Sequence, residues 1–531
     1  MTAMTAQRTI DPDELTLEGV RAGSLRDAPV TVLGFARSGI ALARFLTGAG
    51  ARVTVYDGRP PEELAAALDA LEGRPLRLVL GPDADPAAAW ADAALVTTSP
   101  SINPDYPTTA PRLRAALGEL VRARAAGDRG VPALVSEPDL FLRLCPAPTV
   151  GVTGTKGKTT TAALTAALLG ADPLHPVVLG GNIGVPIVER LFELSADHRV
   201  VYELSELQLP TLSRGSTVAV YTNVTEDHVD RHGSVAAYRR VKRRLAELVD
   251  PDGALVLNAE DPVVAGYAGL GAAPSVPYRF DRPMPGGVGV VDGWIVAAGV
   301  GRLELAGGGA AATGPGGRIL PIEELGLPGR HNVSNAMAAV AAALLFGVAP
   351  DAIRRAAAAF DGVEHRLETV ALVDGVRFIN DSQGTQPDAV AAALRAFPAP
   401  LVLIAGGRDK GVDLSALAPV VAERAVAAVL IGESGPALEA LFRHAGLART
   451  ERATSLEAAV RRADTLAREA LAAGERGRAS GPATVLLSPA AASFDMFEDY
   501  AARGRAFKTT VSALAAERRS PTPAPPGGGD R

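Results

Sequence analysis

The sequence lacks three features that would place it in common functional classes. It has one cysteine, Cys145, in 531 residues, which excludes a disulfide framework and a cysteine-based metal site and suits a reducing cytoplasm. Its formal net charge is −6, so no basic excess favours a nucleic-acid partner. No apolar run reaches the ~20 residues of a membrane-spanning helix, and the N-terminus carries Asp11, Asp13 and Glu14 where a signal peptide would be basic. We therefore expect a cytoplasmic protein without membrane insertion.

The most informative stretch that is present reads GVTGTKGKTT, at residues 151–160. An apolar segment precedes it, two glycines let backbone N–H groups approach an anion, Lys158 precedes two threonines, and an Ala/Leu-rich helix is expected over 162–169. This order predicts a cradle for a nucleotide triphosphate. Its spacing departs from the usual G-x-x-x-x-G-K-[ST] because Val152 occupies the first glycine position. The alternative interpretation is a tight glycine turn before a surface helix.

A second glycine turn lies closer to the N-terminus. From Pro29 the sequence predicts a strand, the turn GFARSG at 34–39, an amphipathic helix and a strand that ends in Asp57. This arrangement is half of a mononucleotide-binding α/β unit, with the turn directed at phosphate and Asp57 at a sugar or base. A purely structural strand–helix–strand corner is the alternative that these residues leave open.

The predicted strands after the phosphate loop carry polar residues at their ends. Glu203 ends one strand, and His228 lies in the acidic loop that follows another. In a mostly parallel sheet both would share an edge with the phosphate loop. Magnesium prefers oxygen ligands, which Thr159 and Glu203 supply, whereas His228 is either a metal ligand or a hydrogen-bond donor of its own loop. Residues 274–320 predict small antiparallel strands or a flexible excursion, and no chemistry is evident in them.

Lys242 lies in an arginine-rich stretch, YRRVKRRLAEL, whose composition is typical of a solvated helix. The spacing indicates otherwise for the lysine, because it falls on the apolar stripe of the helix with Tyr238 and Leu245. An unpaired buried ammonium would cost several kcal/mol. We therefore expect Lys242 to be paired, neutral or chemically modified, and to have a special role.

Polar side chains also open a helix and end three strands in the C-terminal half. Asn332 and Asn335 would hold an adenine edge or a metal-bound water, or Asn332 would only cap the helix. Strand ends expected near 380–385, 408–410 and 488–495 carry mixed charges. They suit a zwitterionic small ligand and part of a nucleotide, although strand-terminal Asp and Ser are also ordinary turn residues.

The alternation of predicted strands and helices indicates an α/β protein of three domains. We expect an N-terminal Rossmann-like domain at 29–147, a central P-loop-type ATPase domain with a mostly parallel sheet at 148–363, and a C-terminal Rossmann-like domain at 364–517. Residues 1–28 are polar and aperiodic and predict a loose leader, and the Pro/Gly-rich tail at 518–531 predicts disorder.

The order of motifs along the chain resembles that of the Mur ligase family. The motifs are G-T-x-G-K-T-T, GGNIG, ELS-x-x-QL, N-x-TEDH-x-DRH, G-x-HN-x-x-N, EHR-x-E, NDS, GG-x-x-K and SP-x-x-x-SFD-x-F, and the likeness covers residues 29–507. The resemblance implies a cytoplasmic enzyme of peptidoglycan synthesis that uses ATP to join D-glutamate to UDP-N-acetylmuramoyl-L-alanine. It also implies two magnesium ions and a carbamylated Lys242; a monomer is the default state.

The resemblance implies roles for individual residues. It places catalysis at Lys158, Glu203, His228 and Lys242, and metal binding at Thr159, Glu203, His228 and the Lys242 carbamate. The residues implied for ATP are Gly154, Thr155, Lys156, Gly157, Lys158, Thr159, Thr160, Asn332, Asn335, Arg366 and Asp381. Those for the UDP substrate are Arg37, Ser38, Asp57, Arg59, Asn182, Ser205 and Gln208. Those for glutamate are Thr385, Lys410, Ser493, Phe494 and Tyr500.

The chain departs from the family pattern after Asp381-Ser382, where relatives typically show K-A-T-N and this chain has Q-G-T-Q. Gln383 thus removes a cation from the expected glutamate site. A sister ligase that adds L-glutamate and a non-catalytic nucleotide-binding protein are the alternatives. A folate polyglutamylating enzyme is disfavoured, because that family is not expected to begin with a UDP-binding α/β unit.

Overall fold

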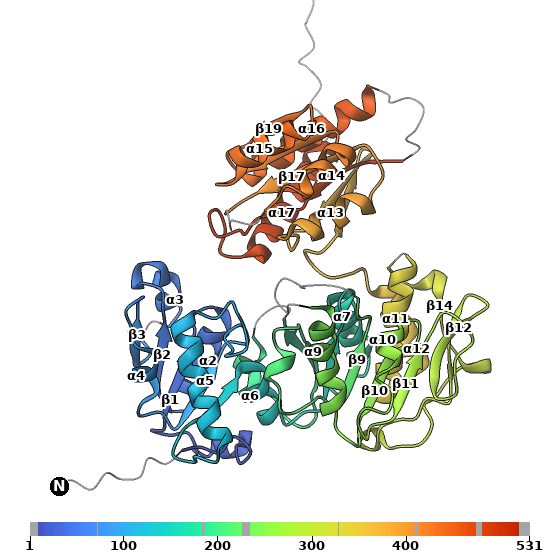
Figure 1. Ribbon diagram of the computed structural model, residues 1–531. Helices are drawn as coiled ribbons and strands as arrows, with labels where there is room; N and C mark the ends of the chain where they lie inside the picture. Colours follow the sequence, from blue (N-terminus) through green and yellow to red (C-terminus); the bar gives the residue numbers. More distant parts are fainter. Residues whose placement is uncertain are drawn as a thin grey trace, which may run out of the picture. The chain divides into compact units, whose positions relative to one another are not determined.

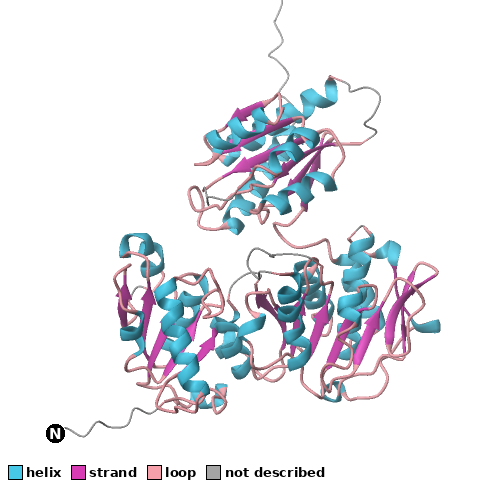
Figure 2. Cartoon of the chain, in the orientation of Figure 1, coloured by secondary structure: helices cyan, strands magenta, loops and turns pink. Residues whose placement is uncertain are grey.

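The structure is a computed structural model, and it describes residues 9–71, 73–182, 186–225, 234–327, 329–408, 413–473 and 481–519. The chain forms two compact units, Met1–Phe360 and Asp361–Arg531. The first unit contains two sheets and the second contains one, each with helices packed on its faces (Figures 1 and 2). The predicted α/β class with three sheet-based parts is confirmed. Within the described ranges, no helix combines the length and the apolar character needed to cross a membrane.

The N-terminal sheet of the first unit has five parallel strands in the order β3-β2-β1-β4-β5. The strand order reverses between β1 and β4, and sheets of this kind bind ligands in the crevice at such a switch point. The strands are β1 (Pro29–Leu33), β2 (Arg52–Asp57), β3 (Leu76–Leu80), β4 (Leu95–Thr98) and β5 (Ala133–Ser136), and the helices are α2 (Arg37–Gly48), α3 (Ala65–Asp69), α4 (Pro86–Trp90), α5 (Pro111–Ala125) and α6 (Glu137–Leu144).

The expected loose leader at 1–28 is wrong for residues 9–28, the part of it that the structure describes. A short helix, α1 (Leu17–Arg21), begins after Thr16, whose side chain accepts a hydrogen bond from Gly19 N. Leu17, Val20 and Leu25 are buried in the same core as α2. Five helical residues are too few to show a helical period in the sequence, so the spacing of the apolar residues does not predict this helix.

The central sheet of the first unit has nine strands in the order β14-β13-β12-β11-β10-β9-β6-β8-β7. From β12 to β7 neighbouring strands are parallel, which confirms the mostly parallel sheet, while β12, β13 and β14 pair antiparallel. The excursion at 274–320 therefore extends the sheet. The strands are β6 (Thr149–Thr153), β7 (Val177–Gly181), β8 (Arg199–Glu203), β9 (Val218–Tyr221), β10 (Ala254–Asn258), β11 (Ser275–Tyr278), β12 (Gly287–Val291), β13 (Trp294–Ala298) and β14 (Arg318–Pro321).

The helices of the central part place two predicted motifs beside each other. Helix α11 is apolar around nearly its whole circumference, which is typical of a buried helix, and it packs against α7. Because α7 starts at the phosphate loop, the first turns of α11 lie close to that loop. The helices are α7 (Lys158–Leu169), α9 (Val235–Leu248), α10 (Pro262–Ala265), α11 (Arg330–Leu345) and α12 (Pro350–Ala359), with 3-10 turns η2 (Ile187–Glu193) and η3 (Leu209–Thr211).

The second unit has a six-stranded sheet in the order β15-β16-β20-β17-β18-β19, parallel except at the edge strand β15. Helices α16 and α17 pack with one of its apolar clusters and α13, α14 and α15 with the other. The strands are β15 (Glu368–Val373), β16 (Val376–Asn380), β17 (Leu401–Gly406), β18 (Ala427–Ile431), β19 (Thr450–Arg452) and β20 (Ala483–Leu487), and the helices are α13 (Pro387–Ala396), α14 (Leu417–Arg424), α15 (Gly435–His444), α16 (Leu456–Ala472) and α17 (Tyr500–Arg519).

The end of α17 corrects the start of the predicted disordered tail. The helix continues to Arg519, and Arg518 is paired with Asp464 of α16. Residues 518 and 519 are therefore ordered by an ion pair and by helix continuation. The rest of the predicted tail, 520–531, lies outside the described residues.

Candidate active site

The phosphate loop connects β6 to α7 and has the geometry of an anion-binding helix start. Gly157 is the N-cap of α7 with a φ of 85°, and no side chain caps this end of the helix. The first N–H groups of a helix have no partner within it, so they face the place where an anion would bind. A Cβ atom on residue 157 would lie 2.6 Å from Asn335 Oδ1. The left-handed backbone and this close approach both require glycine here.

Two asparagines and a threonine that are not among the site residues predicted from the sequence stabilise the phosphate loop. Asn223 O accepts from Thr155 N at 2.7 Å, and the Asn223 side chain accepts from Lys156 N and donates to Lys156 O, each at 2.9 Å. Thr222 Oγ1 also donates to Lys156 O, at 2.6 Å, and Asn258 Nδ2 donates to Thr222 O at 2.7 Å. Asn223 opens the N-x-TEDH motif, and that position was the signal that could have identified it.

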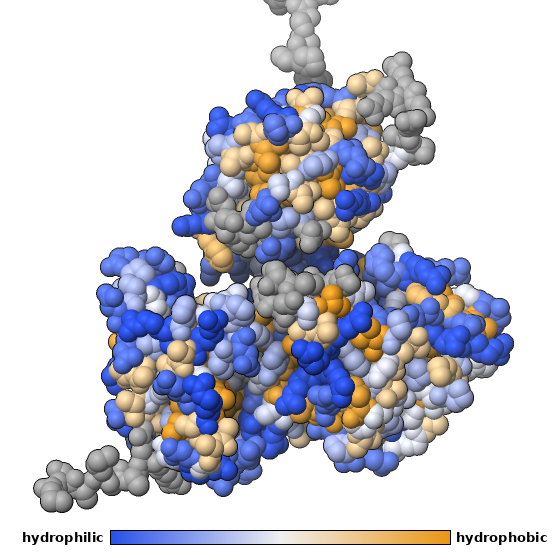
Figure 3. All heavy atoms as spheres, viewed as in Figure 1, coloured by the Kyte–Doolittle hydropathy of each residue, from blue (hydrophilic) through white to orange (hydrophobic). Residues whose placement is uncertain are grey.

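Lys242 is fully buried beneath the phosphate loop, with 0% of its surface exposed. Its Nζ donates to Gly154 O at 2.9 Å and to Thr153 Oγ1 at 3.3 Å. Arg239, Arg240 and Arg243 of α9 are exposed, and Figure 3 shows a strongly hydrophilic patch over this helix. The predicted burial of the lysine within a solvated arginine-rich helix is confirmed.

Glu203, the last residue of β8, presents an incomplete set of hydrogen bonds. Its Oε1 accepts from Asn182 Nδ2 at 3.0 Å. Its Oε2 is buried and has no hydrogen-bond partner among the described residues. A buried carboxylate oxygen without a partner is costly unless a ligand completes its coordination.

These residues fit a magnesium ion, which takes oxygen ligands and keeps several of its waters. The unpartnered Glu203 oxygen and the Thr159 hydroxyl, at the start of α7, are suitable donors. In the described ranges, no three His, Cys, Asp or Glu side chains cluster closely enough to hold a metal ion by themselves. The expected ligand His228 lies outside the described residues.

Asn332 and Asn335 lie in the first two turns of α11. Gly329 is the N-cap of this helix, so the alternative interpretation of Asn332 as a cap is wrong. Asn335 Nδ2 donates to Asn332 Oδ1 at 3.2 Å, and Asn335 Oδ1 is the atom that approaches Gly157. The pair therefore flanks the phosphate loop.

A cavity of about 80 Å³ lies between the N-terminal and central sheets of the first unit. On the N-terminal side it is lined by the start of α2 and by the loop after β4, which is the switch point of that sheet. On the central side, Ser205 N and Oγ donate to Gln208 Oε1 at 2.9 and 3.0 Å. The cavity thus brings together these residues expected at the UDP substrate: Arg37, Ser38, Asn182, Ser205 and Gln208.

Asp57, also expected at the UDP substrate, uses its carboxylate within the protein. Its Oδ2 accepts from Phe35 N at 2.8 Å and from Arg59 Nη2 at 2.8 Å. Its Oδ1 accepts from Arg59 N at 2.9 Å and from Arg59 Nε at 3.0 Å. Burial acts to raise the pKa of Asp57, but these hydrogen bonds outweigh it and the pKa lies below its usual value. Asp57 therefore holds the glycine turn and orients Arg59, whose side chain is 45% exposed and open to a ligand.

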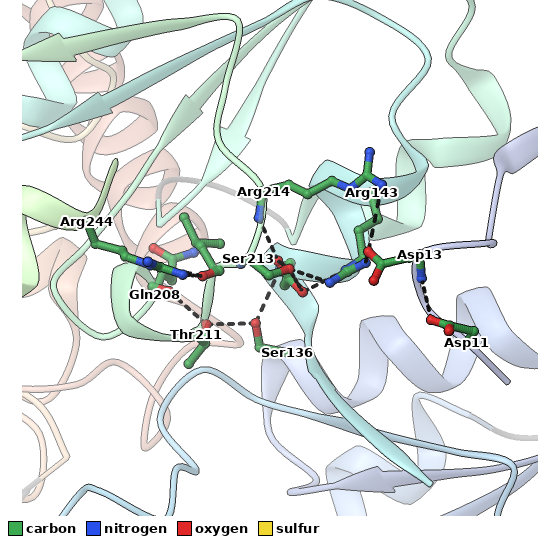
Figure 4. Close-up of polar contacts among 11 residues, drawn as sticks. Asp11, Asp13, Ser136, Arg143, Gln208, Thr211, Ser213, Arg214 and Arg244 are labelled. Carbon is green, nitrogen blue, oxygen red and sulfur yellow. Dashed lines mark hydrogen bonds and ion pairs between the residues drawn. The ribbon is translucent and has the colours of Figure 1, made fainter. Parts of the chain in front are cut away.

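A polar network fixes one border of the cavity by joining α6 to the segment that contains η3 (Figure 4). Asp139 Oδ1 accepts from Ser213 N at 2.6 Å and Ser213 Oγ at 2.8 Å. Arg143 Nε donates to Asp139 Oδ2 at 2.8 Å, and Ser136 Oγ donates to Thr211 Oγ1 at 2.7 Å. Because η3 follows Gln208 directly, this network holds the central wall of the cavity against the N-terminal part.

Three strand ends of the second unit meet at one edge of its sheet, as predicted. Asp381 N, after β16, donates to Leu487 O of β20 at 2.8 Å, and Ser488 Oγ donates to Asp381 Oδ2 at 2.6 Å. Arg408 N, after β17, donates to Ala492 O at 2.9 Å. Burial raises the pKa of Asp381 to about 6, and the Ser488 hydroxyl bond opposes that rise.

Among the described residues expected at glutamate, Thr385, Ser493 and Phe494 lie on these loops and Tyr500 is the first residue of α17. Ser493 is buried, Thr385 is half-buried, and the Tyr500 carbonyl accepts from Ser382 Oγ at 2.7 Å. Phe494 is 67% exposed and contributes little to the core of the unit. Lys410 lies outside the described residues. Arg366, expected at ATP, is exposed close to Asp381.

Arg503, which is not among the site residues predicted from the sequence, holds these loops together. The side chain is 1% exposed, and its Nε donates to Ser382 Oγ at 3.0 Å and its Nη2 to Ser382 O at 2.9 Å. Its Nη1 reaches the carbonyls of Ala491 and Ala492 at 3.3 and 3.2 Å. One guanidinium thus ties the loop after β16 to the loop before Ser493. Arginines are usually exposed, so its type gave no signal of this burial.

Replacing Arg503 with methionine will loosen both loops, because several carbonyl groups lose their donor at once. We expect the free energy of unfolding to fall by about 3 kcal/mol, as for a broken buried polar network. Urea unfolding measures this change. Arg505→Met is the matched control, because Arg505 is exposed on the same helix, and it should unfold like the wild type. Equal stability of the two variants would contradict the assignment.

Comparisons with known proteins place these features in a family. Residues 152–343 match the family described as "Mur ligase middle domain". Residues 365–476 match the family described as "Mur ligase, glutamate ligase domain". The UDP-N-acetylmuramoylalanine–D-glutamate ligase of Symbiobacterium thermophilum is 38% identical over 93% of this chain and 100% of its own length. The chain belongs to the Mur ligase family. The enzyme of the same name from Geobacter metallireducens is 39% identical over 92% of this chain and 98% of its own.

A solved structure also resembles this Mur ligase at low identity. A murein peptide ligase from Psychrobacter arcticus covers 92% of this chain and 98% of its own, with 16% identity and a TM-score of 0.44.

Within the present chain, the middle-domain match contains the phosphate loop, Glu203 and Lys242. The glutamate-ligase-domain match contains Asp381 and Thr385 and ends before Arg503.

Proposed function

We propose that this Mur ligase adds D-glutamate to UDP-N-acetylmuramoyl-L-alanine, with conversion of ATP to ADP and phosphate, in the cytoplasmic stage of peptidoglycan synthesis. The observation that carries the proposal is the likeness to D-glutamate ligases over nine-tenths of this chain and their whole length. The anion-binding geometry of the phosphate loop, the unpartnered Glu203 oxygen and the buried Lys242 support an active enzyme over a non-catalytic nucleotide-binding protein. A monomer remains the default prediction.

The first step must activate a carboxylate, which is a poor electrophile. The terminal alanine carboxylate attacks the γ-phosphorus of ATP, ADP leaves, and an acyl phosphate forms. The N–H groups at the start of α7 and the Lys158 ammonium would stabilise the charge on the phosphates. Asn332, Asn335, Arg366 and Asp381 would contact the rest of the nucleotide.

The second step forms the amide bond. The uncharged amine of glutamate attacks the acyl carbonyl and a tetrahedral intermediate forms. Phosphate then leaves with the electron pair of its C–O bond, and the nitrogen gives one proton to the departing phosphate. Thr385, Lys410, Ser493, Phe494 and Tyr500 would receive glutamate. Water would hydrolyse the acyl phosphate, so the active site must exclude it during the reaction.

Magnesium would be held by Thr159, Glu203 and His228. Bound there, two such ions would neutralise phosphate charge and align the reacting oxygens. The hydrogen bond from Asn182 orients Glu203 for this role. An ammonium cannot ligate a cation, so Lys242 would take part only as a carbamate, whose oxygens are anionic donors.

The acceptor would lie across the cavity between the two sheets of the first unit. Its UDP end would contact Arg37, Ser38 and the exposed Arg59, which Asp57 orients. Asn182, Ser205 and Gln208 would contact its muramoyl-alanine end, which must reach the phosphate loop.

ADP release will require both UDP-N-acetylmuramoyl-L-alanine and D-glutamate. A coupled assay with purified protein, ATP and magnesium measures this dependence when each substrate is omitted in turn. Each omission should reduce ADP release to the background rate, because the acyl phosphate needs the acceptor and its turnover needs the amine. Equal turnover without the muramoyl substrate would contradict the proposed function.

A further inference from the structure

Glu137 is a buried acidic residue that lines the cavity between the two sheets of the first unit, and none of the roles proposed above involves it. It is the first residue of α6, and it is 2% exposed. It lines the cavity together with Asn182 and Gln208, within reach of the Arg37 charge. Its Oε1 has no hydrogen-bond partner among the described residues. Glu137 thus lines the cavity in which the acceptor is expected and carries a buried polar atom without a partner in the described part of the chain.

The surroundings of Glu137 favour an uncharged carboxyl group. Burial raises its pKa to about 7, against the opposing effects of a hydrogen bond from Val188 N–H and of the Arg37 charge. A neutral carboxyl both donates and accepts hydrogen bonds. It also avoids the repulsion that a second anion would exert on a diphosphate bound nearby.

The position of the cavity indicates which part of the acceptor Glu137 meets. One wall belongs to the start of α2, where Arg37 and the helix end suit a diphosphate. The other wall offers the neutral amide and hydroxyl groups of Asn182, Ser205 and Gln208. Between the diphosphate and the reacting carboxylate, the acceptor has an N-acetylated sugar whose hydroxyl and amide groups need such partners.

We propose that Glu137 is a specificity-determining residue of the acceptor site, whose unpartnered carboxyl oxygen hydrogen-bonds the N-acetylated sugar of the nucleotide substrate. The inference rests on the proposed function for the identity of the acceptor. Glu137 would then contact the substrate. Asp139 on the same helix differs, because both of its carboxylate oxygens already accept hydrogen bonds from Ser213.

Calorimetric titration of Glu137→Leu and Glu137→Gln with two probes, UDP-N-acetylmuramoyl-L-alanine and UDP, tests the inference. The leucine variant should bind the sugar nucleotide about 10-fold more weakly than the wild type, as for one lost buried hydrogen bond. Its affinity for UDP should be unchanged, because UDP lacks the N-acetylated sugar that Glu137 would contact. The glutamine variant keeps an acceptor oxygen and should bind both probes as the wild type does.

The pair of probes separates substrate contact from a merely structural role. If Glu137 is purely structural, the leucine variant will bind both probes more weakly or will bind both as the wild type does, and either result would overturn the inference. A glutamine variant that binds the sugar nucleotide as weakly as the leucine variant would also overturn it. Thermal unfolding of the leucine variant with and without sugar nucleotide gives a second readout: the ligand should raise its melting temperature less than it raises that of the wild type. Wild-type turnover is measured separately, so absence of ligase activity would overturn the proposed function while the binding ratio still decides the role of Glu137.

Discussion

Replacing Lys242 with alanine will reduce the rate of amide formation by at least about 100-fold, the effect expected when a group that supports the metal site is lost. The lysine is fully buried and touches the phosphate loop through Gly154 O and Thr153 Oγ1. If it acts as a carbamate, the alanine variant lacks an anionic oxygen donor. Added short carboxylates such as acetate should then restore part of the rate, and a steady-state assay across acetate concentrations measures this.

The controls for Lys242 separate charge, volume and position. Lys242→Met fills most of the space and should be as inactive as the alanine variant but more stable, because less cavity is left. Arg243→Ala, on the exposed side of the same helix, removes only a surface pair with Glu247 and should keep wild-type activity. Full activity of Lys242→Ala, or rescue by a short amine instead of a carboxylate, would contradict the carbamate role.

Glu203→Gln will lower kcat by at least about 100-fold and raise the magnesium concentration needed for half-maximal rate, since one anionic ligand is lost. The glutamine can keep its oxygen toward Asn182, so the hydrogen bond at 3.0 Å survives and the fold is retained. Only the buried oxygen that has no partner is replaced. A magnesium titration of the steady-state rate, with circular dichroism as a check of folding, measures both effects.

The matched control for this variant is Glu193→Gln. Glu193 lies in η2 of the same part of the chain, exposed and paired with Arg190, and its neutralisation should leave the magnesium dependence unchanged. An unaltered magnesium requirement in Glu203→Gln would show that Glu203 is a structural carboxylate and would remove it from the metal site.

The predicted elements that were confirmed are those with a strong local pattern. The glycine loop before an apolar helix located the phosphate loop, and the helical period placed Lys242 in the interior despite four neighbouring arginines. The parallel sheets followed from alternating strands and helices, so the strand ends with Asp381, Arg408 and Ser488 could be expected together. Such patterns are local in sequence, and local physics largely determines them.

The features that were missed depend on contacts between distant segments. Arg503 is buried because it donates hydrogen bonds to backbone carbonyls of two loops. One loop lies more than a hundred residues away in the sequence and the other about ten, and no helical or strand periodicity predicts such contacts. Glu137 looks like an ordinary first-turn acid of a helix until the cavity beside it is seen. Asp57 accepts hydrogen bonds from Phe35 N and Arg59, and its place at the end of a strand did not predict these contacts.

The most direct test of the proposed function is the product formed with each enantiomer of glutamate. The family resemblance implies a lysine at the position of Gln383, so we expect the stereochemical choice to come from the remaining groups of the expected glutamate site. Mass spectrometry of reactions with ATP, magnesium and UDP-N-acetylmuramoyl-L-alanine should show one glutamyl product with D-glutamate, formed at least about 100-fold faster than with L-glutamate. Equal or faster product formation with L-glutamate would contradict the account.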